Sequence, residues 1–511
     1  MCGFVCLWNA GDEELAKAMI DRIDHRGPDA VEVARLDRAP VVMAHCRLSI
    51  IGPDDGRQPI YNTGELLVAN GEIYNHADLR AILADSVFET ASDSETILHL
   101  FRSGESRWIS KLDGMFAFVL ATPARIIAAR DPLGIKPLYM ARLGGGMAFA
   151  SELKAFDGIA VEAVETIPPG TLYDSRDGWR QWYRMPQGAA EPEPGLDTGH
   201  VARELRLVLE EAVAKWMVAD VEVGSFLSGG LDSSIIAAIA QDVLRAQGRG
   251  PLKTFAVGTE GAPDLIAARQ VAEHIGSNHH EWTFTAADLA EAIPHVIYHL
   301  ESADVDLVRS ALPTLFAARL ASRHVKAVLT GEGADELFAG YAYHHAYIDN
   351  PRALADELTR SLGTMHNINL QRVDRVTMSV GLEARTPFLD RELIDFAQSV
   401  PAALKLCRTD PDARESTGAT TEKWILRKAC ADLLPEQLVW RKKAQFDEGS
   451  GTVNTLIEAL GLLDPEIRAG GQVDRDREAA LYERTLRARF VDPERILAAS
   501  GQWDSDARVA V

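Results

Sequence analysis

The sequence predicts two domains of different fold class: an α+β domain with antiparallel sheets over residues 1–185, and an α/β domain with a parallel sheet over residues 201–511. Three observations support this division. The first part holds short apolar runs separated by turn residues. The second part alternates strand-like and helix-like runs. Between them, residues 186–200 are rich in Pro, Gly, Ala and acidic residues, which indicates a linker.

The individual elements follow from the periodicity of the apolar residues. Strands of the first domain are expected at Val41–Met43, Leu66–Ala69, Met115–Ala121 and Met147–Ala150, and helices at Glu13–Ile23 and Asp93–Arg102. The second domain is expected to begin with a long helix over Val201–Val218. Alternating strands and helices are then expected at Val221–Leu227, Ser233–Ala246, Lys253–Val257, Asp264–Ile275 and Lys326–Leu329. Beyond about Met378 the pattern is mostly helical, and the C-terminal end carries no interpretable motif.

The charge of the chain limits its partners. The 511 residues carry a formal net charge of −22, whereas proteins that bind the nucleic-acid backbone usually present a basic face. We therefore expect no nucleic-acid partner, although small anionic ligands need only a few local donors. No apolar run reaches the roughly 18 residues that a membrane span needs, so no membrane partner is expected.

The N-terminus and the cysteines favour a cytoplasmic protein. The first six residues lack the basic segment of a signal peptide. Five cysteines stand at positions 2, 6, 46, 407 and 430. Their odd number and irregular spacing in a long chain are typical of a reduced protein and argue against a disulfide framework.

Cys2 directly follows the initiator methionine, and removal of that methionine would make Cys2 the N-terminal residue. Its α-amino group could then act as an internal base for the thiol. A thiolate is the strong nucleophile that attack on an amide carbonyl requires. A cysteine in this position can also be a small buried apolar residue, so the choice depends on the residues that accompany it.

Later motifs supply what an amidase acting on glutamine needs. The Asn70 side chain and the Gly71 N–H form a donor pair for a tetrahedral oxyanion. Arg47 is a bidentate cation suited to the substrate carboxylate. Asp93 is an acid suited to the substrate ammonium. These motifs favour Cys2 as a nucleophile.

The motifs MCG, HRGPD, RLSI, NGEIYN and SDSE occur in this order, and residues 1–185 thereby resemble the class II, N-terminal nucleophile, glutamine amidotransferases. The resemblance implies an Ntn-hydrolase αββα sandwich with Cys2 as the nucleophile. It also implies a glutamine site formed by Arg47, Ile50, Asn70, Gly71, Glu72 and Asp93. Glu72 is expected at the ammonium end of the substrate.

The segment Ser225–Ser234 has the pattern of a strand, a glycine-rich turn and the start of a helix. Glycines let the backbone approach a ligand, and hydroxyl and N–H groups at a helix start bind anions. An isolated GGxDS can also be an ordinary turn, and no GxxxxGK[S/T] pattern of a Walker A loop occurs. The segment resembles the SGGxDS pyrophosphate loop of enzymes that cleave ATP between its α and β phosphates. The resemblance implies an ATP and pyrophosphate site formed by Leu227, Ser228, Gly229, Gly230, Asp232, Ser233 and Ser234.

The two halves together resemble the glutamine-hydrolysing asparagine synthetases over about residues 1–450. The match includes the segments LTGEGADELFAGY, GLEARTPFLD and WRKKAQF. It implies an adenine-nucleotide α-hydrolase-like synthetase domain in which aspartate and ATP form β-aspartyl-AMP and pyrophosphate. Ammonia from the glutamine site would then reach the adenylate through an interdomain tunnel.

The same resemblance assigns residues of the synthetase site. Glu332 and Lys443 are implied as catalytic residues. Further ATP-binding residues are implied at Val257, Thr330, Gly331 and Lys443. Mg²⁺ is implied at Asp232 and Asp335, and the acceptor at Arg309, Glu332, Asp335 and Asp374. Homodimers are common in this family, and nothing in the sequence itself shows one.

One segment departs from the family pattern. Asparagine synthetases read roughly ETYD[VI]TT[VI]RAS there, whereas this chain has Asp306 and Leu307 in place of the paired threonines and keeps Arg309. A carboxylate near an acidic substrate repels it unless paired, or favours an acceptor that carries a donor group. The acceptor is therefore aspartate, with variation outside direct contact, or another carboxylic acid.

Overall fold

The computed structural model describes residues 2–37, 39–62, 64–408, 420–441, 449–467 and 473–500. In its first part, two antiparallel sheets of six strands each have the orders β10-β8-β9-β1-β3-β2 and β12-β11-β7-β6-β5-β4. The strands are β1 (Cys2–Trp8), β2 (Ala30–Arg35), β3 (Val41–Arg47), β4 (Ile60–Asn62), β5 (Glu65–Ile73), β6 (Gly114–Thr122), β7 (Arg125–Arg130), β8 (Tyr139–Leu143), β9 (Gly146–Ala150), β10 (Val164–Thr166), β11 (Thr171–Asp174) and β12 (Gly178–Gln181). The helices are α1 (Glu13–Ile20), α2 (His76–Ile82) and α3 (Glu95–Arg102).

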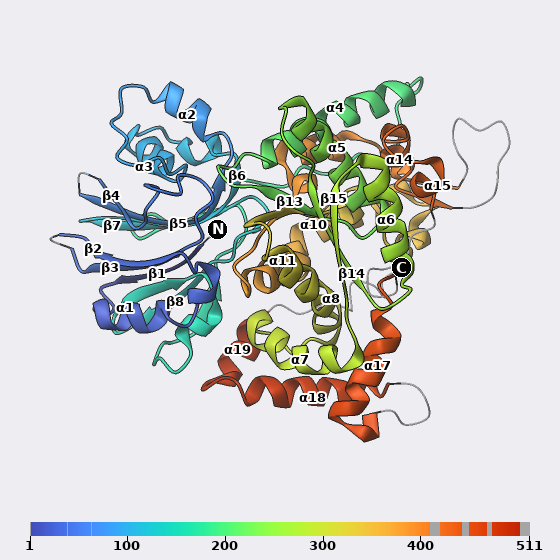
Figure 1. Cartoon of the computed structure of the whole chain (residues 1–511). Helices are drawn as coiled ribbons and strands as arrows, with labels where there is room; N and C mark the ends of the chain where they lie inside the picture. The colour runs from blue at the N-terminus through green and yellow to red at the C-terminus, as the bar shows by residue number, and fades with distance from the viewer. Residues whose placement is uncertain are drawn as a thin grey trace.

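The alternation of side chains along the strands explains the layers. On β1, Phe4 and Cys6 point into the core between the two sheets. Val5 and Leu7 point to the opposite face, where the core includes residues of α1. Helix α3 packs on the outer face of the other sheet (Figure 1). The order helix, sheet, sheet, helix confirms the predicted αββα sandwich.

The second part is built on a parallel five-stranded sheet of order β15-β14-β13-β16-β17. Its strands are β13 (Val223–Phe226), β14 (Lys253–Gly258), β15 (Asn278–Thr283), β16 (Ala327–Leu329) and β17 (Glu383–Arg385). The helices around it are α4 (Thr198–Trp216), α5 (Leu231–Ala246), α6 (Pro263–Ile275), α7 (Ala286–Leu300), α8 (Val305–Ala321), α9 (Ala334–Phe338), α10 (Pro351–Thr364), α11 (Asn369–Met378), α12 (Arg391–Ser399), α13 (Ala402–Lys405), α14 (Trp424–Ala429), α15 (Glu436–Val439), α17 (Thr452–Leu463), α18 (Arg475–Arg487) and α19 (Pro493–Ala499).

The predicted α/β fold class is confirmed, but two strands of the sheet, β15 and β17, were not predicted. β15 lies at the edge of the sheet and has no buried residue, so it gives no apolar run. β17 lies in the segment expected to be mostly helical. It has three residues, and two of them, Glu383 and Arg385, are charged and fully buried. An apolar pattern cannot reveal a strand whose buried side chains are ionic.

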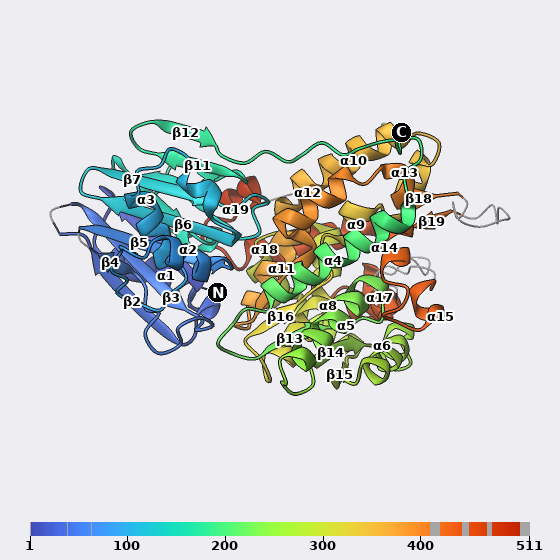
Figure 2. The same ribbon diagram turned by 90° about the horizontal axis from the view of Figure 1, so that it is seen from above.

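Two segments connect the parts of the molecule. The chain between β12 and α4 forms no helix or strand and runs along the second part in Figure 2, where the Ala189 N–H donates to the Gln398 carbonyl oxygen at 2.8 Å. Near the C-terminus, α19 returns to the first part. There Arg495 donates to the carbonyl oxygens of Phe156 and Ile159 at 3.0 and 2.9 Å.

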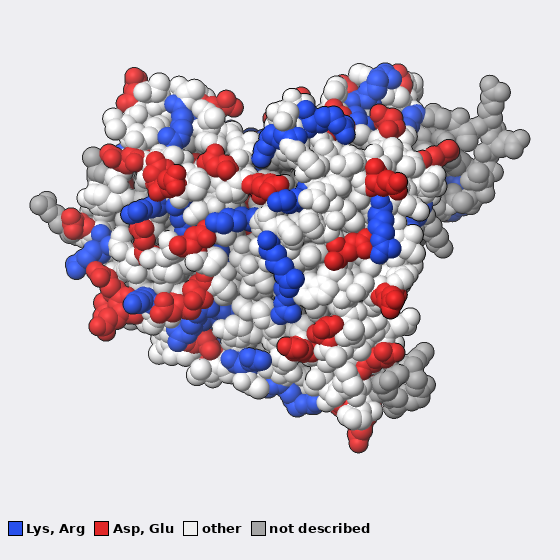
Figure 3. Space-filling view, in the orientation of Figure 1, with Lys and Arg blue, Asp and Glu red and all other residues white. Residues whose placement is uncertain are grey.

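The described helices include none that is both long enough and apolar enough to cross a membrane. On the face shown in Figure 3, basic side chains are interspersed with acidic ones.

Candidate active sites

The first candidate site lies where β1, β3 and β5 meet. Cys2 begins β1 opposite Arg47, the last residue of β3. The Cys2 backbone nitrogen donates to the Asn70 side-chain oxygen at 3.1 Å. Burial raises the pKa of the Cys2 thiol. The structure therefore brings three of the sequence-predicted residues, Cys2, Arg47 and Asn70, to one end of the two sheets.

Asn70 offers a donor at this point. Its side chain is fully buried, and no described residue accepts a hydrogen bond from its Nδ2. A buried amide N–H without an acceptor is costly, so such a group is commonly kept for a ligand. The donor is placed next to Cys2, as stabilisation of an oxyanion would require.

Gly71 is needed for this arrangement. Its φ is +140°, and a Cβ atom there would lie 1.9 Å from the Met115 carbonyl oxygen on β6. The neighbouring strand thus excludes any side chain at this position.

We expect Gly71→Ala to lower the melting temperature and the glutaminase activity together. Positive-φ strain costs roughly 1–3 kcal/mol, and the clash with β6 adds to it. Gly64→Ala is the matched control, because Gly64 also has a positive φ, +91°, but a Cβ atom there meets nothing within 4 Å. Equal melting temperatures for the two variants would contradict the role of the clash.

The other predicted glutamine-site residues surround this point. Arg47 is held by the carbonyl oxygens of Pro53, Ile51 and Gly52 at 3.1, 3.2 and 2.5 Å. Ile50, which follows Arg47 closely in the sequence, is buried. Asp93 accepts from the Ile73 N–H at 2.6 Å, and burial raises the pKa of its carboxyl group.

Glu72 faces the second part of the molecule. Its carboxylate lies 3.7 Å from the Arg385 guanidinium on β17. Burial, together with the nearby Glu383 and Asp93 carboxylates, raises its pKa well above the usual value. This contact crosses the domain interface, which the sequence did not indicate.

Asp374 also lies at the interface and does not line the synthetase cavity. It pairs with Arg26 at 2.8 Å and lies 3.6 Å from Lys136, both in the first part of the chain. Arg26 also pairs with Glu152, at 2.6 Å. The sequence-based assignment of Asp374 to the acceptor is therefore not supported by its position. The buried interface uses this carboxylate to neutralise cations of the other domain.

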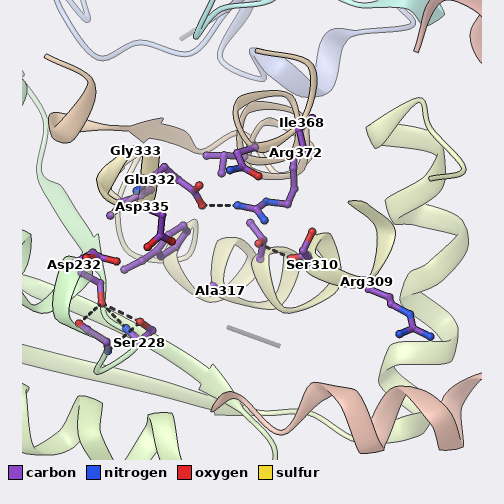
Figure 4. A pocket seen from close by; sticks show the side chains of 18 of the residues that line it. Ser228, Asp232, Arg309, Ser310, Ala317, Glu332, Gly333, Asp335, Ile368 and Arg372 are labelled. Carbon is purple, nitrogen blue, oxygen red and sulfur yellow. Dashed lines mark hydrogen bonds and ion pairs between the residues drawn. The ribbon is translucent and has the colours of Figure 1, made fainter. Parts of the chain in front are cut away.

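The second candidate site is a cavity of about 720 Å³ (Figure 4). Such a volume suits a nucleotide-sized ligand. Many of the predicted ATP-site and acceptor-site residues line it: Leu227, Ser228, Gly230, Asp232, Ser233, Val257, Arg309, Thr330, Gly331, Glu332 and Asp335.

The phosphate loop lies between β13 and α5 and is held by hydrogen bonds among its own residues. The Ser228 and Ser233 hydroxyls lie 3.0 Å apart, and the Gly230 N–H donates to the Ser228 hydroxyl at 3.3 Å. The Ser234 hydroxyl donates to the Gly230 carbonyl at 2.7 Å. A Cβ atom at Gly229, whose φ is +71°, would meet α6 at 2.6 Å. The loop is thereby fixed with hydroxyl and N–H groups at the start of a helix.

Lys423 is the main residue that the sequence analysis missed. Its Nζ lies 2.6 Å from both carboxylate oxygens of Asp232 and 2.5 Å from Asp335. Burial alone lowers the pKa of this lysine, but the two carboxylates outweigh it, and the pKa rises. The only sequence signal was a lysine directly before the apolar helix α14. Lys443 lies outside the described residues, whereas Arg441 donates to the Gly229 carbonyl at 3.2 Å.

Glu332 and Glu336 form a second acidic group in the cavity. Glu332 pairs with Arg372 at 2.5 Å, and burial raises the pKa of its carboxyl group. Burial and the nearby Asp335 carboxylate raise the pKa of Glu336 to about 7. Tyr341 donates to Glu336 at 2.6 Å. These acids can orient a cationic or proton-donating reactant.

The acceptor segment lies at the N-terminal end of α8. Arg309 forms two hydrogen bonds to Glu478 of α18, at 2.8 and 2.5 Å. Asp306 lines the cavity and pairs with Arg475 at 2.8 Å. Leu307 is buried. The sequence predicted neither partner from α18.

Comparisons with known proteins agree with the two parts of the chain. Residues 1–167 match the glutamine amidotransferase domain, and residues 204–354 and 346–507 match the asparagine synthase family. An asparagine synthetase [glutamine-hydrolyzing] of Asparagus officinalis is 39% identical over 472 residues, covering 88% of this chain and 78% of the relative. Asparagine synthetase [glutamine-hydrolyzing] 2 of Arabidopsis thaliana is also 39% identical over 472 residues, covering 88% and 79%. The chain belongs to the family of glutamine-hydrolysing asparagine synthetases.

Proposed function

We propose that the protein makes asparagine from aspartate, using ATP and ammonia taken from glutamine. The observation that carries this proposal is the presence of both sites in one chain: Cys2 beside the buried Asn70 amide, and the phosphate loop beside Lys423. We assign glutamine hydrolysis to residues 1–185, a linker to 186–200 and the synthetase to 201–511.

In the first site, the Cys2 thiol adds to the glutamine amide carbonyl and its proton passes to the amide nitrogen. The C–N bond then breaks to release ammonia, and water hydrolyses the remaining thioester to glutamate. Asn70 and Gly71 donate to the oxyanion that forms on addition. Arg47 has donors left beyond its three loop carbonyls, and these bind the glutamine carboxylate. Asp93 binds the ammonium, with Ile50 and Glu72 beside it.

In the second site, the phosphate loop holds ATP. We assign adenine to Val257, with Thr330 and Gly331 beside the nucleotide, and the phosphates to Ser228–Ser234. Asp232 and Asp335 both pair with the Lys423 amine, which occupies the point on which they converge. The carboxylate lone pairs that the amine does not use, together with phosphate oxygens, would hold Mg²⁺, which would neutralise phosphate charge. Lys423 and Lys443 stabilise the departing pyrophosphate.

Glu332, held by Arg372, orients the ammonia that displaces AMP. We propose that ammonia crosses the buried interface between the domains. All five cysteines are buried and free, which supports a cytoplasmic location. A homodimer stays a prediction.

Pyrophosphate release from Mg²⁺-ATP, measured with aspartate and with a panel of other carboxylic acids, tests this proposal. We expect the strongest release with aspartate, and asparagine once glutamine is added. No release with aspartate, but release with another acid, would keep both sites and assign the enzyme to that acid.

A further inference from the structure

One wall of the synthetase cavity carries an ion pair whose acidic member, Asp306, stands where the family pattern has a threonine. Asp306, in the first turn of α8, accepts from Arg475, the first residue of α18, at 2.8 Å. Both residues line the same cavity as Ser228 and Glu332. Their side chains are about half exposed, 56% for Asp306 and 52% for Arg475.

Arg309 is already occupied by a buried partner. It donates from two nitrogens to both carboxylate oxygens of Glu478, whose side chain is fully buried. Glu478 also accepts from the Tyr482 hydroxyl at 2.9 Å. In Figure 4 the Arg309 guanidinium points away from Glu332 and Asp232. An acceptor that took Arg309 would leave the Glu478 carboxylate buried without its cation, which is unfavourable.

The ion-paired arginines that line the described part of the cavity differ in how exposed their side chains are. The described arginines that line it are Arg309, Arg372 and Arg475. Arg372 is 15% exposed and pairs with Glu332, which the proposed chemistry uses. The Arg475 side chain is the most exposed of these three arginines. An exposed ion pair contributes little to stability, because water solvates both charges. A substrate can therefore replace this pair with its own charges at small cost.

We propose that Asp306 and Arg475 bind the α-ammonium and α-carboxylate groups of the acceptor amino acid. An amino acid presents these two opposite charges on one carbon, and the two side chains present the complementary charges side by side. Arg309 and Ser310, on the same stretch of α8, lie at the opposite end of the cavity from Ser228 and Asp232 (Figure 4). An acceptor held at this end directs its side-chain carboxylate toward the phosphate loop. This inference rests on the proposed function and explains why a carboxylate replaces a threonine there.

The variants Arg475→Gln and Asp306→Asn test the inference in the full-length protein. We expect each to raise the KM for aspartate by about two- to fivefold, as for loss of one partly exposed ion pair. The KM values for ATP and glutamine should not change, and kcat at saturating aspartate should be largely kept. Arg477→Gln is the matched control, because Arg477 lies on the same helix and pairs with Glu466, not with a cavity residue.

Two simpler acids separate the two charges. Succinate lacks the α-ammonium, and β-alanine lacks the α-carboxylate. Pyrophosphate release should show that Asp306→Asn reduces the preference for aspartate over succinate, and that Arg475→Gln reduces the preference for aspartate over β-alanine. A merely structural role would not change these two preferences separately.

The outcomes distinguish this inference from the function on which it rests. If the wild type makes asparagine but both variants match Arg477→Gln in aspartate KM and in acid preference, the inference is wrong and the proposed function stands. If the wild type releases no pyrophosphate with aspartate, the proposed function itself is wrong, and the aspartate assignment of Asp306 and Arg475 is withdrawn with it.

Discussion

Replacement of Cys2 by alanine is expected to abolish asparagine synthesis from glutamine while synthesis from ammonium chloride continues. The thiol is the proposed nucleophile of glutamine hydrolysis, and loss of a nucleophile commonly reduces the rate by roughly 10³-fold or more. The synthetase cavity contains no part of Cys2. Chromatographic measurement of asparagine with each nitrogen source checks the prediction.

Cys6→Ala is the matched control for this experiment. Cys6 lies on the same strand, but its side chain is fully buried between the sheets, and burial raises its thiol pKa. This variant should keep both activities. If Cys2→Ala lost the glutamine-dependent and ammonia-dependent activities equally, the proposed separation of the two sites would be wrong.

Lys423→Met is expected to show the opposite pattern, with glutamine hydrolysis kept and pyrophosphate formation reduced by roughly 10²-fold or more, as for loss of one preorganised electrostatic contact. The substitution leaves the Asp232 and Asp335 carboxylates close together without the amine that joins them. Their repulsion and the lost cation both weaken binding of the phosphates. Pyrophosphate and glutamate release, measured in parallel, report on the two sites.

Lys428→Met serves as its control. Lys428 lies on α14 just after Lys423 in the chain, but its amine donates to the Thr198 hydroxyl at 3.0 Å and does not reach the cavity. Full pyrophosphate formation by Lys423→Met would show that this lysine only balances charge in the folded protein.

The sequence predicted those features that depend on contiguous residues. The strand, loop and helix around Ser228 follow one another in the chain, so the turn chemistry and the apolar periodicity revealed them. Several of the proposed glutamine-site residues also lie in contiguous motifs, such as Arg47 at the end of β3 and Asn70, Gly71 and Glu72 in β5. Their assignment to glutamine stays a prediction. The missed features join distant residues. Lys423 and Asp232 are separated by 191 positions, and Arg309 and Glu478 by 169.

Buried charge was the second reason why the sequence-based assignments failed. Asp374 carries a side chain typical of an active site, yet the structure uses it to pair with Arg26 across 348 positions. A single sequence does not distinguish a carboxylate that binds substrate from one that neutralises a buried arginine. The strand β17 was missed for the same reason.

We propose that ammonia released at Cys2 amidates the aspartate activated at the phosphate loop. Glutamine labelled with ¹⁵N in its amide, supplied with aspartate, Mg²⁺-ATP and unlabelled ammonium, tests it by mass spectrometry of the asparagine formed. We expect asparagine with ¹⁵N in its side-chain amide, and one AMP and one pyrophosphate for each asparagine. Glutamate release without labelled asparagine, or ADP and phosphate in place of AMP and pyrophosphate, would contradict it.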